Sequence, residues 1–419
     1  MRNFLKKILK KSPIFIRKFS VQVNELFAKY YCNAKENKNY KNINNKIIRK
    51  TNKKIKNILI YHIAGLGFGG TEKNLQNLAN NLTDDYTIFF MCSSRFINEE
   101  RKELMNKKIK IILFDYKKKE DYYPYFIYGM KPHIKNILEE NSIDLLIISD
   151  TGHSQYPFNT IKNIPIIFIN NFGAPCLQKN VVNTIFVSET VQKHSEFYTG
   201  KKSGNISLFV PLSKPPKEAT TEAKKIRTLF NIHDDDFVFG RIGRNSDDIF
   251  DAIGIESFEK VIMEYPKTHY IIMSPPPILQ KIVKERKIKN VHFINPSGDE
   301  TKIWGFHYAI DSLAHFRSDG ETFGLNIAES MYARKPIISH TSEIWNAHID
   351  YLRPEFARIA ELHDTKMYIN HMKEYINLKE LSPEKWQEMG EKAHIYATEH
   401  FSEELYIKKI KNVILTSTL

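Results

Sequence analysis

Two glutamates and the backbone amides between them form the strongest chemical signal in this sequence. Glu321 and Glu329 lie eight residues apart in the segment SDGETFGLNIAES, between a predicted strand and a predicted helix. With the helix starting at Gly324, Glu329 lies about a turn and a half inside it, so both carboxylates reach a ligand held at the helix N-terminus. Carboxylates accept hydrogen bonds from sugar or ribose hydroxyls, while the N–H groups of Thr322, Phe323 and Gly324 suit phosphate or sugar oxygens.

The second signal is the glycine-rich turn GLGFGG at 65–70, which is followed by Thr71 and Glu72. It comes directly after a predicted strand and opens a predicted helix, where Gly69 and Gly70 let the backbone approach an anion or a diphosphate closely. The spacing is not G-x-G-x-x-G and no Gly-Lys-Ser/Thr follows, so neither a dinucleotide fingerprint nor a P-loop is present. A tight connection without a ligand is the alternative interpretation.

Short apolar runs alternate with amphipathic segments from residue 57 onward. The predicted strands of the first half are 58–63, 87–91, 109–114, 144–149, 164–169 and 184–187, with helical patterns at 71–82 and 132–140. After the Pro-rich break at 210–218, the predicted strands are 237–242, 269–273, 290–294, 312–316 and 336–339, and the helices are 221–230, 251–264, 278–287 and 324–333. This alternation predicts an α/β protein with two doubly wound parallel sheets and a cleft between them.

The predicted domains follow from this pattern and from the 419-residue length. Residues 1–56 form a basic extension and linker, 57–212 the first Rossmann-like domain, and 213–400 the second. From Ser382 onward the sequence reads as helical, and 401–419 is expected to be a helix that packs back on the first domain.

The positive charge is confined to the start of the chain. Residues 1–56 carry 17 Lys and Arg against two acids, whereas the rest carries 45 against 46, within a formal net charge of +14. A folded nucleic-acid-binding domain is therefore not expected. Near the N-terminus, Phe4, Leu5, Ile8 and Leu9 share a helical face that lysines surround, which suits an anionic membrane surface. A helix docked on the protein's own body and a disordered basic arm are the other interpretations.

The motifs taken together resemble the family-4 glycosyltransferases, which are retaining enzymes of the GT-B fold. GETFGLNIAE at 320–329 is similar to that family's E-x7-E motif, and KPIIS at 335–339 follows it as in the family. FVFGRIGR at 237–244 is similar to its strand ending in Gly-Arg, and FGGTE at 68–72 to its N-terminal glycine loop. The resemblance spans roughly residues 57–400, and the extension lies outside it.

The resemblance implies a role for each matching residue. Glu321 would contact the donor sugar and Glu329 the ribose of its nucleotide, while Arg244 would contact the diphosphate. Gly69 and Gly70 would line the opposite wall of the cleft. Fixed cations and helix N-termini would stabilise the leaving diphosphate without a metal, so no metal and no cofactor are expected.

Three departures from the family pattern stand out. No Lys follows Arg244 in NSDDIF at 245–250, and Arg241 is the candidate substitute for the missing diphosphate partner. SPPP at 274–277 replaces a glycine-rich turn in the wall that would recognise the base. Where the family often has a catalytic His, Asp150 stands, and His153 follows three residues later; a surface-loop position is the alternative for His153.

The predicted function is transfer of a sugar, with retention, from a nucleotide-sugar donor, expected to be a UDP-sugar, to a glycan or lipid-linked acceptor. Capsule or lipopolysaccharide synthesis at the cytoplasmic face of a bacterial membrane fits the basic extension and the three widely spaced cysteines, which do not form the pattern of a disulfide framework. Two alternatives stay open: a catalytically silent GT-B protein that senses nucleotide sugars or partners an active transferase, and an epimerase on the same fold.

Overall fold

The computed structural model describes residues 54–114, 130–150, 158, 161, 163–174, 180–199, 206–207 and 212–417. These residues separate into two compact units. The second unit is Leu212–Ser402, and the first unit comprises the described residues before Leu212 together with those from Glu403 onward. The amphipathic segment near the N-terminus lies outside the described residues. No helix in the described ranges is long and apolar enough to cross a bilayer.

A parallel sheet forms the centre of the first unit, with the strand order β3-β2-β1-β4-β5-β6-β7. Its strands are β1 Asn57–Tyr61, β2 Thr87–Ser93, β3 Lys110–Phe114, β4 Leu145–Asp150, β5 Ile166–Asn170, β6 Val181–Phe186 and β7 Ile206–Ser207. Its helices are α3 Gly70–Leu82, α4 Glu99–Glu103, α5 Met130–Glu140, α6 Glu189–Thr199 and α14 Glu403–Thr416, with the 3-10 turn η2 at Ser94–Phe96. Strands β1, β2, β4 and β5 are apolar on both faces, as strands covered by helices on both sides must be.

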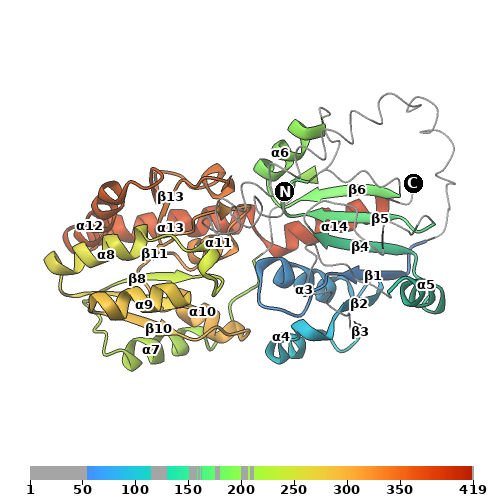
Figure 1. Cartoon of the computed structure of the whole chain (residues 1–419), viewed down its shortest axis with the longest axis horizontal. Coiled ribbons are helices and arrows are strands. Elements are labelled where there is room, and N and C mark those ends of the chain that lie inside the picture. Colours follow the sequence, from blue (N-terminus) through green and yellow to red (C-terminus); the bar gives the residue numbers. More distant parts are fainter. Residues whose placement is uncertain are drawn as a thin grey trace, which may run out of the picture. The chain divides into compact units, whose positions relative to one another are not determined.

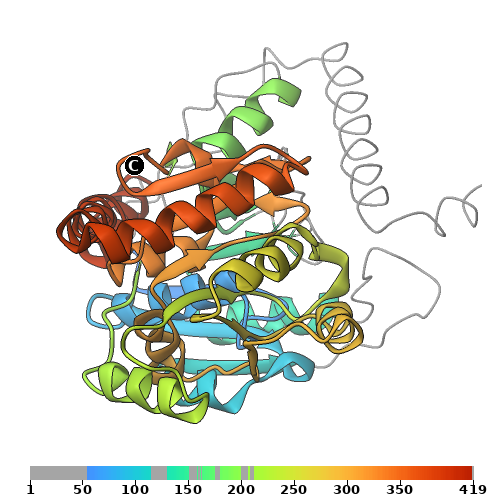
Figure 2. The same ribbon diagram turned by 90° about the vertical axis from the view of Figure 1, so that its left-hand side faces the viewer.

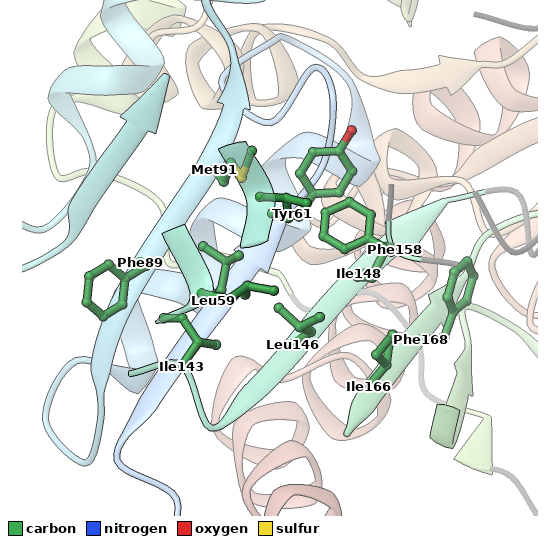
Figure 3. Packing of buried hydrophobic residues seen from close by; sticks show 12 residues of the cluster. Leu59, Tyr61, Phe89, Met91, Ile143, Leu146, Ile148, Phe158, Ile166 and Phe168 are labelled. Atoms are coloured by element: carbon green, nitrogen blue, oxygen red, sulfur yellow. The ribbon is translucent and has the colours of Figure 1, made fainter. Parts of the chain in front are cut away.

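One face of this sheet carries a buried hydrophobic cluster (Figure 3). Alternate residues of four neighbouring strands point to the same side, where Ile134 and Leu138 of α5 cover them. The strand members are Leu59, Tyr61, Phe89, Met91, Leu146, Ile148, Ile166 and Phe168. This packing fixes the positions of the strand ends, where the loops with polar side chains begin.

The second unit contains a parallel sheet in the order β10-β9-β8-β11-β13-β15. Its strands are β8 Phe237–Ile242, β9 Thr268–Met273, β10 Val291–Ile294, β11 Ser312–Ala314, β13 Ile337–His340 and β15 Ala357–Ala360. Its helices are α7 Ala219–Leu229, α8 Ile253–Glu264, α9 Pro277–Arg286, α10 Glu300–Ala309, α11 Leu325–Tyr332, α12 Thr365–Leu381 and α13 Pro383–His400. Helices flank each of the two sheets (Figure 1). The prediction of two doubly wound parallel α/β units is confirmed.

The helical region after Ser382 consists of two helices, because the helical conformation is interrupted at Phe401 and Ser402. Helix α13 packs on α11 and α12 in the second unit; these helices are among the orange and red ribbons of Figure 2. Helix α14 packs on α3 in the first unit. Ser417 directly follows this helix, and its Oγ lies 2.7 Å from Asn183 Nδ2 of β6. Helix α14 is therefore part of the first unit, although it follows the second unit in sequence.

Candidate functional site

Glu321 lies in a short strand rather than in an open loop. Strand β12, Gly320–Glu321, pairs in parallel with β14, Trp345–Asn346, beyond the carboxyl ends of β11 and β13. Gly320 has a φ of +70°, and a Cβ there would lie 1.8 Å from the carbonyl oxygen of Trp345. Only glycine fits this position, so the backbone presents the next residue, Glu321, in one fixed direction.

Both carboxylate oxygens of Glu321 contact cationic or N–H groups from the end of β11. His315 Nε2 lies 3.1 Å from Oε1, and Arg317 Nη1 lies 3.6 Å from Oε2. Arg317 also binds Asp319 through Nε at 2.6 Å, which holds the guanidinium in place. Burial alone would raise the pKa of Glu321, but Arg317 and the His315 hydrogen bond outweigh burial and lower this pKa to about 2. Glu321 is therefore an anion at neutral pH.

Buried histidines adjoin this carboxylate and the backbone of Arg317. The His315 ring is 5.7 Å from that of His348, centroid to centroid, and His340 Nε2 accepts the backbone N–H of Arg317 at 3.2 Å. Burial is the largest cause that lowers the pKa of His348, to about 3, and burial also lowers the pKa of His340. Both side chains are therefore neutral at physiological pH. Nδ1 of His348 is buried and has no hydrogen-bond partner.

Helix α11 starts beside Glu321, and its start is tied to β8. Gly324 caps the helix with a φ of +92°, and Tyr351 donates its hydroxyl proton to the carbonyl oxygen of Phe323 at 2.6 Å. Asn326 donates from Nδ2 to the carbonyl oxygen of Ile242 at 2.7 Å. The helix start, with Thr322 partly exposed and the Phe323 ring buried, therefore adjoins the carboxyl end of β8.

The two arginines at the end of β8 have different environments. Arg241 is 2% exposed, lies 5.0 Å from the Phe316 ring centroid, and has a buried Nη1 without a hydrogen-bond partner. Burial lowers the pKa of Arg241 to about 10, so the guanidinium stays charged. Arg244, three residues later, is exposed. Strand β8 thus places one buried and one exposed cation close to the start of α11.

Glu329 points into the second unit rather than toward solvent. It is 4% exposed, and its Oε2 lies 3.3 Å from Nε2 of His307 in α10. The other ring nitrogen of His307 lies 2.8 Å from Ser330 Oγ. Contact between Glu329 and a ribose stays a prediction.

In the first unit, a carboxylate lies at the glycine-rich turn. Gly69 caps α3, and a Cβ on Gly69 would lie 2.0 Å from Oε2 of Glu72, so this side chain folds back over the helix start. Gln76 Nε2 donates to the carbonyl oxygen of Gly65 at 2.8 Å and fixes the turn from inside. Asp150 is the last residue of β4. Asn171 directly follows the neighbouring strand β5, and its Nδ2 donates to the Asp150 carbonyl oxygen at 3.1 Å. His153 lies outside the described residues.

The sequence motifs predicted the acidic segment but missed the histidines. His315 and His340 follow or end neighbouring parallel strands, and this position at two adjacent strand ends is the signal that could have identified them. In the described ranges, no group of three or more His, Cys, Asp and Glu side chains is arranged to hold a metal ion.

Comparison with known proteins identifies the fold. No family model matches the sequence, and no curated protein matches it. Among solved structures, HepE from Anabaena in complex with UDP and glucose matches with a TM-score of 0.66 at 14% identity, over 87% of this chain and 100% of that one. A glycosyltransferase from Rickettsia africae matches with a TM-score of 0.68 at 13% identity, over 87% and 99%.

WaaG, described as a glycosyltransferase involved in lipopolysaccharide biosynthesis, matches with a TM-score of 0.61 at 12% identity, over 85% of this chain and 99% of that one. These similarities extend over both units. The chain therefore has the GT-B fold of such enzymes, as the motifs implied.

Proposed function

We propose that this protein is a glycosyltransferase that moves a sugar from a nucleotide-sugar donor to a glycan or lipid-linked acceptor. The observation that carries the proposal is the ionised Glu321 beside the start of α11, in a chain with the GT-B fold. UDP is the proposed donor nucleotide because the Anabaena structures with this fold contain UDP or UDP-glucose. Retention of anomeric configuration, and a place in bacterial surface polysaccharide synthesis, follow from the resemblance to family 4.

The second unit would hold the donor. Glu321 accepts hydrogen bonds from hydroxyls of the donor sugar, and the N–H groups at Thr322 and Gly324 approach its phosphate oxygens. Arg244 is exposed, which suits direct contact with the diphosphate. Arg241 is buried and charged, and it adds positive potential without direct contact. These fixed charges stabilise the negative charge that develops on the leaving diphosphate, so the reaction is proposed to need no metal.

The first unit would bind the acceptor. Gly70 is exposed at the start of α3, the Glu72 carboxylate lies over Gly69, and Asp150 ends β4 beside Asn171. Asp150 and His153 are the proposed partners of the reacting sugar on this side. The carboxylate of Glu72 at the α3 start favours a hydroxyl-bearing acceptor over an anionic one at this turn.

The first experiment measures thermal stabilisation and turnover with UDP-, GDP-, ADP- and CMP-sugars, each with and without EDTA. One donor is expected to raise the Tm and to be consumed, with no effect of EDTA. Glu321→Gln should lower kcat by about 100-fold or more, because the anion that contacts the sugar is gone. It should also lower the Tm, because Arg317 and His315 lose their charged partner. Glu355→Gln, which changes an exposed carboxylate of the same unit, is the matched control and should retain full activity. Full turnover by Glu321→Gln would contradict this role.

A catalytically silent nucleotide-sugar sensor is the second candidate function. The observation that favours it is the absence of a Lys between Arg244 and Phe250, which leaves exposed Arg244 without a second cation there. A sensor would be stabilised by a nucleotide sugar and would neither hydrolyse nor transfer it. Binding with turnover would exclude this candidate.

A further inference from the structure

The side chain of His315 is held at both ring nitrogens. Strands β11 and β13 pair in parallel, with Ala314 opposite Ile338, and this register places His315 beside Ser339. Ser339 Oγ lies 3.1 Å from Nδ1 of His315, while Nε2 lies 3.1 Å from Oε1 of Glu321. Ser339 is fully buried and His315 is 3% exposed, so water does not compete for the hydrogen bond between them.

The backbone of His315 is fixed as firmly as its ring. Its N–H donates to the carbonyl oxygen of Ile338 at 2.8 Å, and its own carbonyl oxygen accepts the hydroxyl proton of Tyr368 in α12 at 2.9 Å. Tyr368 is itself fully buried. The backbone that carries the ring is therefore held by β13 and α12, and the imidazole cannot turn away from Glu321 without also breaking its contact with Ser339.

The order of the contacts excludes a nucleophilic role for the serine. In a serine hydrolase the hydroxyl must reach the substrate, whereas Ser339 Oγ has no access to solvent. If Ser339 donates to Nδ1, the ring N–H lies on Nε2 and points at the carboxylate. The chain of contacts ends at Glu321, which is the one member that reaches the site.

We propose that His315 is a positioning residue, which holds the Glu321 carboxylate in the orientation and charge state that the donor sugar requires, with Ser339 fixing its tautomer. This rests on the proposed function. Nη1 of Arg317 lies 3.6 Å from Oε2, the other carboxylate oxygen of Glu321. A substitution at His315 therefore leaves this ion pair in place. His348 and Arg241 also face Glu321, whereas His340 faces the backbone of Arg317.

The test compares His315→Phe, His315→Gln and Ser339→Ala with wild-type protein on the donor found by the nucleotide-sugar screen. Phe keeps the ring volume and loses both hydrogen bonds, whereas the amide of Gln can still donate to Glu321. His315→Phe is expected to lower kcat by about 10- to 100-fold, the equivalent of one hydrogen bond to a charged group. The acid limb of its pH profile should move to higher pH, because Glu321 loses a group that stabilises its ionised form.

Two results support the assignment together: His315→Gln recovers most of the kcat that His315→Phe loses, and Ser339→Ala lowers kcat by only a few-fold (about 3-fold). The assignment is overturned if His315→Phe keeps the wild-type kcat and pH profile. It is also overturned if Gln and Phe lower kcat equally and in proportion to a lower Tm, since that is the behaviour of a packing residue.

A measurement without turnover separates this inference from the proposed function. Side-chain 15N NMR of wild-type protein should show the His315 proton on Nε2, and Glu321→Gln should shift that resonance. An inactive wild-type protein with this resonance would defeat the proposed function and leave the His315–Glu321 contact established. A proton on Nδ1 would overturn the assignment whatever the activity.

Discussion

Glu321 serves in this molecule as a fixed negative charge. A pKa of about 2 means that it does not exchange a proton with a substrate between pH 5 and 9, so a general acid or base must come from elsewhere. Its carboxylate is suited to accept hydrogen bonds and to balance positive charge. Under the proposed function, a donor sugar that presents hydroxyl or amino groups to Glu321 would therefore be favoured over one that presents a carboxylate.

Gly320 is the residue at which a single methyl group should be most harmful near this site. In Gly320→Ala the Cβ meets backbone at a left-handed φ, so we expect a loss of at least about 2 kcal/mol of stability and a Tm lower by about 4 °C or more. Gly243→Ala is the control in the same unit, because Gly243 has no left-handed φ and the nearest atom that its Cβ would meet belongs to the Arg241 side chain, 3.1 Å away, rather than to the backbone. Thermal unfolding compares the two, and equal Tm values would show that the Gly320 turn adapts.

At the scale of elements, the edge strand β10 of the second sheet and its neighbour β9 carry a pH-sensitive pair of histidines. His292 of β10 hydrogen-bonds through Nε2 to Nδ1 of His269 in β9 at 2.9 Å, and His269 Nε2 lies 3.2 Å from Asp236. Burial, followed by the neighbouring His269, lowers the pKa of His292 to about 4. In the unfolded chain an ordinary His has a pKa of about 6.5.

Stability should therefore fall as the pH drops from about 6.5 to about 4, because in this window the unfolded chain binds a proton that folded His292 does not. His292→Gln removes this titration, so its stability should depend less steeply on pH. Denaturant unfolding between pH 7 and pH 4.5 measures the slopes. His363→Asn, which changes a side chain that is 68% exposed, should keep the wild-type slope. A wild-type slope in His292→Gln would refute the assignment.

The sequence predicted strongly apolar elements best and short polar ones worst. Strand β8 coincides with the predicted range 237–242, because hydrophobic burial alone determines it. Helices α10 and α12 and strand β15 were not predicted individually. Helix α10 is buried on several sides and has no clear polar face, so helical periodicity is weak there. The two-residue strands β12 and β14 depend on pairing between distant segments, which periodicity does not contain.

The same distinction applies to the site. Glu321, Glu329 and Gly324 were predicted because their spacing along one loop and helix is itself a pattern. His315 and Ser339 are 24 residues apart, and only the register of β11 and β13 brings them together. The inward direction of Glu329 also depends on a partner in another helix, His307, that no local spacing reveals.

At the scale of the whole molecule, the first unit is built from two separate stretches of chain. Buried side chains of α14 provide one layer of it: Tyr406, Ile407, Ile410, Val413 and Ile414. Lys411 Nζ lies 2.5 Å from Asp85 Oδ2 near the end of α3, and this exposed ion pair adds little beside the apolar contacts.

Removal of residues 403–419 should therefore destabilise the first unit selectively. Hydrogen exchange should show lost protection in β1, β2 and β4, while β8, β9 and β13 of the second unit stay protected, since no member of that sheet loses a covering helix. Lys411→Ala in the full chain is the control and should leave both sheets protected. Unchanged protection of the first sheet in the shortened protein would contradict the role of α14.

This discontinuity also sets an order of events on the ribosome. Residues of the first sheet are translated first, but the helix that covers α3 is made only after the whole of Leu212–Ser402. Within the described residues the second unit is one continuous stretch, Leu212–Ser402, so a nascent chain can complete this stretch earlier. The half of the molecule synthesised second is thus the half that can finish folding first, and the apolar surface beneath α14 needs shielding until translation reaches residues 403–416.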